Sequence, residues 1–203
     1  MSFGEIAALT LHDVKNRLAE LAGRAEQRGD RETMYAILEA AEALTRLLAY
    51  YRSESGTLHP DFDAHAPADL LVELAADGQA RGEIAIEVDG RSAPTFWFYD
   101  EALVRMVLAN ALHNALRHAR ARIVLAAEDR RDWLALRVRD DGDGFPESVL
   151  ADGGASAPVT REGTGLGLRL AKRVAEMHVN GGRTGTIRLA NDHGAVFELM
   201  LPK

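Results

Sequence analysis

The sequence predicts an α+β protein in which an N-terminal antiparallel helical hairpin precedes a two-layer α/β sandwich. The first 54 residues carry two runs of apolar residues at helical spacing, joined by a very short connection. The last part, from residue 68, alternates strand-like and helix-like patterns. Such alternation is typical of helices packed on a mixed sheet. We therefore expect a helical domain over 1–54, a linker over 55–67 and a sandwich domain over 68–203.

The first helix is predicted over Ser2–Arg28, where apolar or small residues are spaced alternately by three and four. These seam residues are Gly4, Ala7, Leu11, Val14, Leu18, Leu21 and Ala25. Gly29 is suited to end the helix, and Asp30 is suited to cap the next one. The pattern therefore predicts a second helix close behind the first.

The second helix has its own apolar seam, and its connection to the first allows only an antiparallel arrangement. The seam residues are Met34, Ile37, Ala41, Leu44, Leu48 and Tyr51. Full burial of one large apolar side chain contributes roughly 1.5–3 kcal/mol, and a lone hairpin buries such side chains poorly. We therefore expect a homodimer whose two hairpins form a four-helix bundle. The alternative is that the hairpin packs on the second domain of its own chain.

The linker is predicted from the composition of SESGTLHPDFDAHAP, which is rich in turn-forming residues. Beyond it, helices are predicted over 68–79, 101–118 and 166–177, with Asp100 as the N-cap of the second. Strands are predicted over 84–88, 95–99, 121–127, 133–138, 186–190 and 196–201, with a turn at Asp89-Gly90 between the first two. These elements form the predicted sandwich.

Charge and composition exclude several classes of function. The formal net charge is −7, and no basic stripe is present, so we expect no binding to nucleic acid or to an anionic membrane. The absence of cysteine excludes disulfides and cysteine-based zinc sites. No signal peptide is visible, and no apolar run approaches the roughly 20 residues that span a bilayer. The expected location is the cytoplasm.

Asparagines inside the helix predicted over 101–118 are the first sign of chemistry. Asn110, Asn114 and Arg117 lie at helical spacings on one face. Asparagine is unfavourable inside a helix unless its amide makes specific interactions. Its amide oxygen is a suitable Mg²⁺ ligand, and an arginine can bind phosphate. Ordinary surface positions are the alternative.

Two glycine-rich loops follow. The first, Asp140-Asp-Gly142-Asp-Gly144, comes directly after a strand, and its glycines permit close approach of a ligand. A calcium loop is disfavoured here because a strand, not a helix, precedes it. The second loop, Gly163-Thr-Gly165-Leu166-Gly167, opens a helix, whose free N–H groups can bind phosphate. It is not a Walker A loop, because no Gly-Lys-Ser/Thr follows.

In their order and spacing, these three segments resemble the N, G1 and G2 boxes of the ATPase superfamily that includes histidine kinases, gyrase B, the ninety-kilodalton heat-shock chaperone and MutL. The resemblance covers residues from about 68 to 203 and implies a two-layer α/β sandwich that binds ATP with Mg²⁺. It implies that Asn114 is the metal ligand, with Asn110 nearby, and that Asp140 accepts the adenine amino group. Gly142 and Gly144 would shape the adenine pocket, and Gly163, Gly165, Leu166 and Gly167 would line the triphosphate side. The stretch 147–162 takes the position of the ATP lid but lacks a recognisable phenylalanine box.

The segment Leu11-His12-Asp13-Val14-Lys15-Asn16-Arg17 resembles the H box of histidine kinases. His12 follows the seam residue Leu11, so it lies about 100° around the helix, toward solvent. An unprotonated imidazole nitrogen can attack phosphorus, and Asp13 can take the other ring proton. The family resemblance implies that Asn16 orients a water for dephosphorylation. The proline that is frequent after this segment in the family is replaced by Arg17.

Together these features predict a soluble histidine kinase of a two-component system. It would autophosphorylate His12 from ATP, pass the phosphoryl group to a response-regulator aspartate, and act also as the phosphatase of that regulator. We expect the input signal to come from a separate sensor protein. Two alternatives remain: a histidine phosphotransferase with a vestigial ATPase domain, and a serine kinase of the anti-sigma-factor type.

Overall fold

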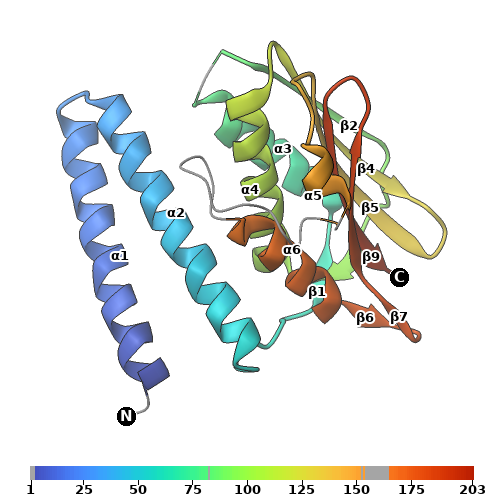
Figure 1. The fold of residues 1–203 in the computed structure, drawn as a ribbon, viewed down its shortest axis with the longest axis horizontal. Coiled ribbons are helices and arrows are strands. Elements are labelled where there is room, and N and C mark those ends of the chain that lie inside the picture. The colour runs from blue at the N-terminus through green and yellow to red at the C-terminus, as the bar shows by residue number, and fades with distance from the viewer. Residues whose placement is uncertain (1–2, 82, 152, 154–164) are drawn as a thin grey trace. The chain divides into compact units, whose positions relative to one another are not determined.

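The chain folds into two compact units, residues 1–58 and 59–203 (Figure 1). This computed structural model describes residues 3–81, 83–151, 153 and 165–203, with side chains described from Asp13 onwards. The first unit is helical and the second combines helices with a mixed sheet, so the predicted α+β class is confirmed.

The first unit is a helical hairpin, formed by α1 (Phe3–Gln27) and α2 (Arg31–Glu54). Gly29 has a positive φ of 70° in the connection, a conformation that favours glycine. The carboxylate of Asp30 accepts a hydrogen bond from the Thr33 N–H at 3.1 Å and caps α2. The sequence predicted Gly29 after the end of the first helix and Asp30 as the N-cap of the second, and both predictions are confirmed.

The hairpin buries only part of its apolar surface. Ala22, Ala25 and Ala49 are buried, because small side chains let the two helices approach closely. Four larger apolar side chains stay between 39% and 47% exposed: Val14, Leu21, Leu47 and Tyr51. They leave an apolar surface on the hairpin that its own two helices do not cover.

The second unit is built on a five-stranded sheet in the order β2-β4-β5-β9-β8. Its strands are β2 (Ala85–Ser92), β4 (Arg122–Asp129), β5 (Trp133–Asp140), β8 (Thr186–Asn191) and β9 (Ala195–Pro202). Only the pair β2–β4 is parallel, and the other pairs are antiparallel. The parallel pair is possible because β3 and α4 supply the long crossover that such strands need.

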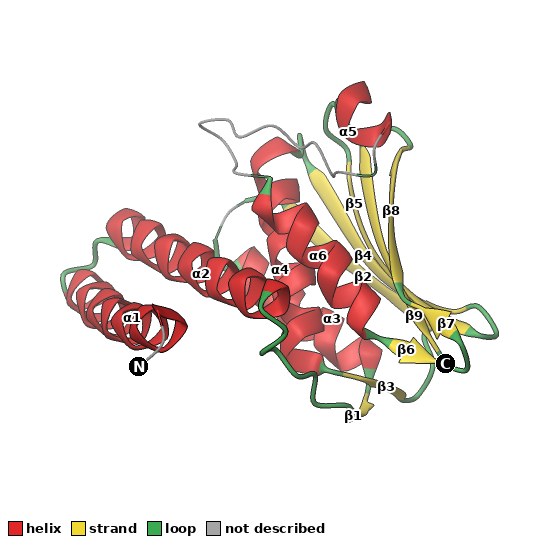
Figure 2. Cartoon of the chain, turned by 60° about the horizontal axis from the view of Figure 1, so that its bottom comes forward, coloured by secondary structure: helices red, strands yellow, loops and turns green. Residues whose placement is uncertain are grey.

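Helices cover one face of this sheet (Figure 2). They are α3 (Pro67–Gln79), α4 (Glu101–His118) and α6 (Leu166–Met177). Burial alternates along β4, as expected when one face packs on helices and the other faces water. The inner face supplies fully buried side chains from the central strands, namely Ile123, Leu134, Leu136, Leu199 and Leu201. The opposite face carries charged residues.

Asp100 ties the start of α4 to two other segments. Its carboxylate caps α4 by accepting the Leu103 N–H at 2.9 Å, as predicted, and it also accepts the Asp61 N–H at 2.9 Å. Its own N–H donates to Nε2 of the buried His178 at 3.2 Å, just after α6. Nδ1 of His178 lies 2.7 Å from the Val174 carbonyl and donates to it, because Nε2 is the acceptor. The start of α4 and the end of α6 are therefore fixed to each other.

Several elements differ from the sequence prediction. β2 runs through the predicted turn at Asp89-Gly90, with a register irregularity between Asp89 and Ser92. It pairs with β4, whereas β3 (Trp97–Tyr99) pairs with β1 (Asp63–His65), so the expected neighbours along the chain are not neighbours in a sheet. β1 lies inside the stretch that we interpreted as a linker. The short elements α5 (Glu147–Ala151), β6 (Val179–Asn180) and β7 (Arg183–Thr184) also escaped prediction.

Candidate active site

Three predicted residues lie in a row along α4. Asn110, Asn114 and Arg117 are one turn apart from each other, so they share one stripe of the helix. Asn110 is half-buried, whereas Asn114 and Arg117 are exposed. The amide of Asn114 is therefore available to a ligand from solvent, while that of Asn110 is partly enclosed by protein.

The partner that encloses Asn110 is the start of α6. A Cβ atom added at Gly167 would overlap the side-chain amide of Asn110. Gly165 precedes the helix with a positive φ of 65° and caps it without a side chain. A helix start of this kind presents backbone N–H groups, which is the chemistry that suits an anion. Leu166, the first residue of α6, is half-buried.

The end of β5 supplies the third segment. Asp140 pairs in register with Ile123, whose side chain is fully buried under the helices, so Asp140 lies on the inner face of the sheet. Asp140 itself is only 7% exposed. Its Oδ1 accepts N–H groups from Gly142 at 2.8 Å and Ala195 at 3.1 Å. Within the described part of the chain, no donor is found for its Oδ2, so that oxygen has lone pairs for a ligand.

The loop after Asp140 is locked to the end of α4. A Cβ atom at Gly142 would overlap the His118 carbonyl, so glycine is needed for this close approach. Asp141 accepts N–H groups from Arg120 at 2.8 Å and from Ala121 at 3.1 Å. These backbone hydrogen bonds, that from Ala121 foremost, hold the pKa of Asp141 below its usual value. Arg120 also forms an ion pair with Asp143.

Gly144 packs against a residue that sequence reasoning missed. It has a positive φ of 86°, and a Cβ atom there would overlap the side chain of Asn191 at the end of β8. The loop after Asp140 therefore contacts two other segments. Gly142 lies against the end of α4, and Gly144 lies against Asn191 at the end of β8. The sequence signal for the second contact is weak, because Asn191 and Gly194 read only as turn formers.

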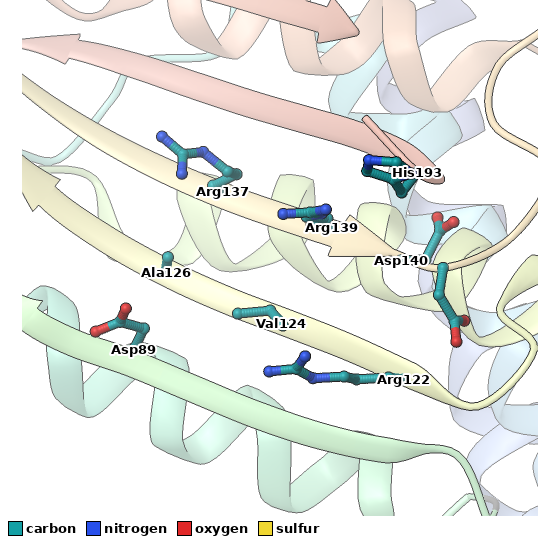
Figure 3. Close-up of a pocket in the computed structure, with 9 residues that line it drawn as sticks. Asp89, Arg122, Val124, Ala126, Arg137, Arg139, Asp140 and His193 are labelled. Carbon is teal, nitrogen blue, oxygen red and sulfur yellow. The ribbon is translucent and has the colours of Figure 1, made fainter. Parts of the chain in front are cut away.

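A pocket of about 370 Å³ lies on the other face of the sheet (Figure 3). It is bordered by Asp89, Arg122, Val124, Ala126, Arg137, Arg139, Asp140, Asp141 and His193. Its arginines already have acidic partners: Arg122 pairs with Glu87, Arg137 with Glu198 and Arg139 with Asp192. It contains none of the α4 or α6 residues described above. We therefore place the candidate site on the helical face of Asp140, not in this pocket.

Two predicted regions fall partly outside the described residues. Gly163 lies outside them, as does most of the predicted lid over 147–162, whose first turn is α5. His12 belongs to α1, and its side chain is likewise outside the described part. Asp13 and Asn16 are both exposed on α1. Among the described residues, no group of three or more His, Asp or Glu side chains could hold a metal ion.

Comparison with known proteins decides the family. The model for "Histidine kinase-, DNA gyrase B-, and HSP90-like ATPase" matches residues 99–203. This range includes α4, β5 and α6, and with them Asn110, Asn114, Arg117, Asp140 and Gly167. The chain belongs to this ATPase family. The predicted resemblance is confirmed.

The curated relatives of the chain are histidine kinases. The signal transduction histidine-protein kinase AfsQ2 of Streptomyces coelicolor is 37% identical over 80% of this chain and 30% of that protein. AtoS of Escherichia coli, a signal transduction histidine-protein kinase, is 27% identical over 99% of this chain and 35% of its own length. The chain thus spans about a third of the length of these relatives.

A solved structure matches both units of the chain. Full-length ShkA in complex with AMPPNP matches with a TM-score of 0.69 and 20% identity, over 98% of this chain and 45% of that one. At that identity the likeness shows the fold alone. No helix in the described part of the chain is both long and apolar enough to cross a membrane.

Proposed function

We propose that the chain is the catalytic portion of a two-component histidine kinase, which binds ATP between α4, α6 and the end of β5. One observation carries this proposal. The three segments predicted to bind nucleotide meet in the structure, because Gly167 lies on Asn110 and Gly142 lies on the end of α4. Their meeting places Oδ2 of Asp140, for which the described residues supply no donor, in the same unit as the start of α6.

Asp140 is the proposed acceptor of the adenine amino group. A carboxylate accepts hydrogen bonds but cannot donate them, so Oδ2 favours a base with an amine at this position. Because Asp140 is almost buried, the hydrogen bond would form away from water, where it discriminates between bases most strongly. Gly142 and Gly144 let the loop after Asp140 pack closely against the His118 carbonyl and Asn191, which sets the position of this carboxylate.

The triphosphate is proposed to lie toward α6 and the exposed stripe of α4. The N–H groups of Leu166 and Gly167 suit phosphate oxygens, and the guanidinium of Arg117 suits them as well. Asn114 fits as a Mg²⁺ ligand, because Mg²⁺ prefers oxygen ligands and binds through few protein groups plus substrate phosphates. When bound, Mg²⁺ would neutralise charge on the phosphates.

His12 is the proposed phosphoryl acceptor. A ring nitrogen lone pair forms the P–N bond while the bond from the γ-phosphorus to the bridging oxygen breaks, and ADP leaves. Asp13 takes the proton from the other ring nitrogen. A receiver-domain aspartate of a response regulator then forms a P–O bond as the P–N bond breaks. Asn16 is proposed to orient a water for dephosphorylation of the regulator: the water oxygen forms a new P–O bond, the bond from phosphorus to the aspartate oxygen breaks, and inorganic phosphate leaves.

The hairpin is proposed to form a homodimer. The exposed side chains of Val14, Leu21, Leu47 and Tyr51 offer the apolar surface that a second hairpin would bury. A separate protein is proposed to supply the input signal. Both partners are expectations from the family and from this surface.

Calorimetry with ATP and Mg²⁺, followed by radiolabelling from γ-labelled ATP, tests the proposal. We expect one nucleotide per chain and a label that is lost in acid, as a phosphohistidine is. Absence of both binding and label contradicts the proposal. An acid-stable, base-labile label would instead indicate a serine kinase.

A further inference from the structure

Asn191 joins two loops that are far apart in the sequence. Its Oδ1 accepts the Phe145 N–H at 2.8 Å, and its Nδ2 donates to the Phe145 carbonyl at 3.0 Å. One side chain thus pairs with both backbone groups of a single residue, as a neighbouring strand would. Only one orientation of the amide satisfies both bonds. The end of β8 and the loop after Asp140 are therefore held together (Figure 2).

The turn that follows Asn191 also holds Asp140. The Ala195 N–H donates to Oδ1 of Asp140 at 3.1 Å. Gly194 lies so close to the Asp140 carbonyl that a Cβ atom there would overlap it. Figure 3 shows His193, in the same turn, beside the end of the strand that bears Asp140. The β8–β9 turn therefore contacts the loop at Asp140, Gly144 and Phe145.

We propose that Asn191 is a positioning residue for base recognition, which fixes the Asp140 loop so that Oδ2 of Asp140 faces the nucleotide. The inference rests on the proposed binding of adenine at Asp140. Asn191 does not touch the base in this account. Asn191 acts through its hydrogen bonds to Phe145 and its contact with Gly144. The N–H of Ala195, at the end of the turn that follows Asn191, holds Oδ1 of Asp140.

The orientation of Asp140 gives this role its physical basis. A carboxylate can rotate and exchange its two oxygens, and a loop of several glycines resists such motion poorly. Two N–H groups hold Oδ1, one from the loop itself and one from the β8–β9 turn. If the loop moves away from the turn, the bond from Ala195 is lost. The amine of the base then meets an oxygen that is no longer fixed.

The test compares ATP with inosine triphosphate, which carries an oxygen in place of the adenine amino group. Affinities for both nucleotides are measured by calorimetry on wild type, Asn191→Ala and the control His193→Asn. His193 lies in the same turn with a positive φ of 52°, which asparagine tolerates, and its side chain contacts neither Phe145 nor Asp140 by a hydrogen bond within the described residues.

We expect Asn191→Ala to bind ATP about threefold to thirtyfold more weakly, because two neutral hydrogen bonds are lost. Its affinity for inosine triphosphate should change less, so the ratio of the two affinities falls toward one. A merely structural role would reduce the fraction of competent protein and leave that ratio unchanged. An unchanged ratio in Asn191→Ala overturns the inference while the proposed function stands. A wild type that does not distinguish the two nucleotides overturns the adenine assignment itself.

Discussion

The side-chain amide of Asn110 lies directly against Gly167, so the α4 and α6 segments of the candidate site are in contact. Glycine is required there, because a methyl group would overlap the amide. This contact joins the segment that we propose to face Mg²⁺ to the segment that we propose to face phosphate.

Gly167→Ala is therefore expected to separate α6 from α4 and to weaken ATP binding at least about tenfold, which corresponds to roughly 1.4 kcal/mol. Gly23→Ala is the matched control. Gly23 lies in α1 with no neighbour near the added methyl group, so alanine should stabilise the helix by about 0.5–1 kcal/mol. Calorimetry on both variants checks the prediction, and equal ATP affinities would contradict it.

Asp140→Asn replaces one carboxylate oxygen by an N–H donor at nearly the same shape. If the remaining oxygen keeps its bonds to Gly142 and Ala195, the new donor faces the adenine amine, and ATP affinity falls about tenfold to a hundredfold. The melting temperature should change little. Asp143→Asn, in the same loop but 91% exposed in its side chain, is the control. A loss of the same size in both variants would argue against a specific role for Asp140.

His178 should make stability depend on pH. Burial lowers the pKa of His178 from 6.5, although its hydrogen bond to the Val174 carbonyl opposes the shift. The neutral ring accepts the Asp100 N–H through Nε2. The unfolded chain therefore binds more protons between the lowered pKa and about 6.5. The contribution of His178 to the free energy of unfolding is fully present above this pH window, and it is lost as the pH falls through the window. The nearby charge of Asp100 opposes this shift but does not cancel it.

Thermal melts of wild type and His178→Gln from pH 7.5 to pH 5 check this sign. Glutamine keeps one acceptor and one donor but does not titrate. The variant should lose stability at pH 7.5 and show a smaller decrease on acidification than wild type. Identical slopes would show that His178 does not titrate with unfolding.

The dimer is tested by placing charge on the exposed apolar surface of the hairpin. Leu21→Glu and Leu47→Glu should give monomers in analytical ultracentrifugation, because each carboxylate would be buried without a partner in a four-helix bundle. Glu26→Lys, an exposed change on α1, should leave the sedimentation coefficient unchanged. A wild-type monomer, or dimers of all three variants, would contradict the proposal.

Much of the fold follows from local signals. Asp30 and Asp100 cap the predicted helices because a short acidic side chain reaches the free N–H groups at a helix start. The strand partners of β2 and β3 did not follow, because pairing depends on distant segments and not on local pattern. β1 was not predicted, because it lies in a polar, proline-containing stretch and is defined as a strand by its pairing with β3.

The candidate site shows the same division. Asn110, Asp140 and Gly167 stand in recognisable motifs, so the sequence identified them before their contacts were known. Asn191 was missed because an asparagine in a turn needs no further explanation. Its function depends on Phe145, 46 residues away, and only the structure places the two side by side.

The central claim is that ATP held at Asp140 and Gly167 phosphorylates His12, and localisation of the phosphoryl group tests it most directly. Wild type, His12→Ala and Asp140→Ala are incubated with γ-labelled ATP and Mg²⁺, and the labelled residue is identified by mass spectrometry at neutral pH. We predict an acid-labile label on His12 in wild type alone, with ATP binding retained by His12→Ala. A label of equal amount on His12→Ala would contradict the account.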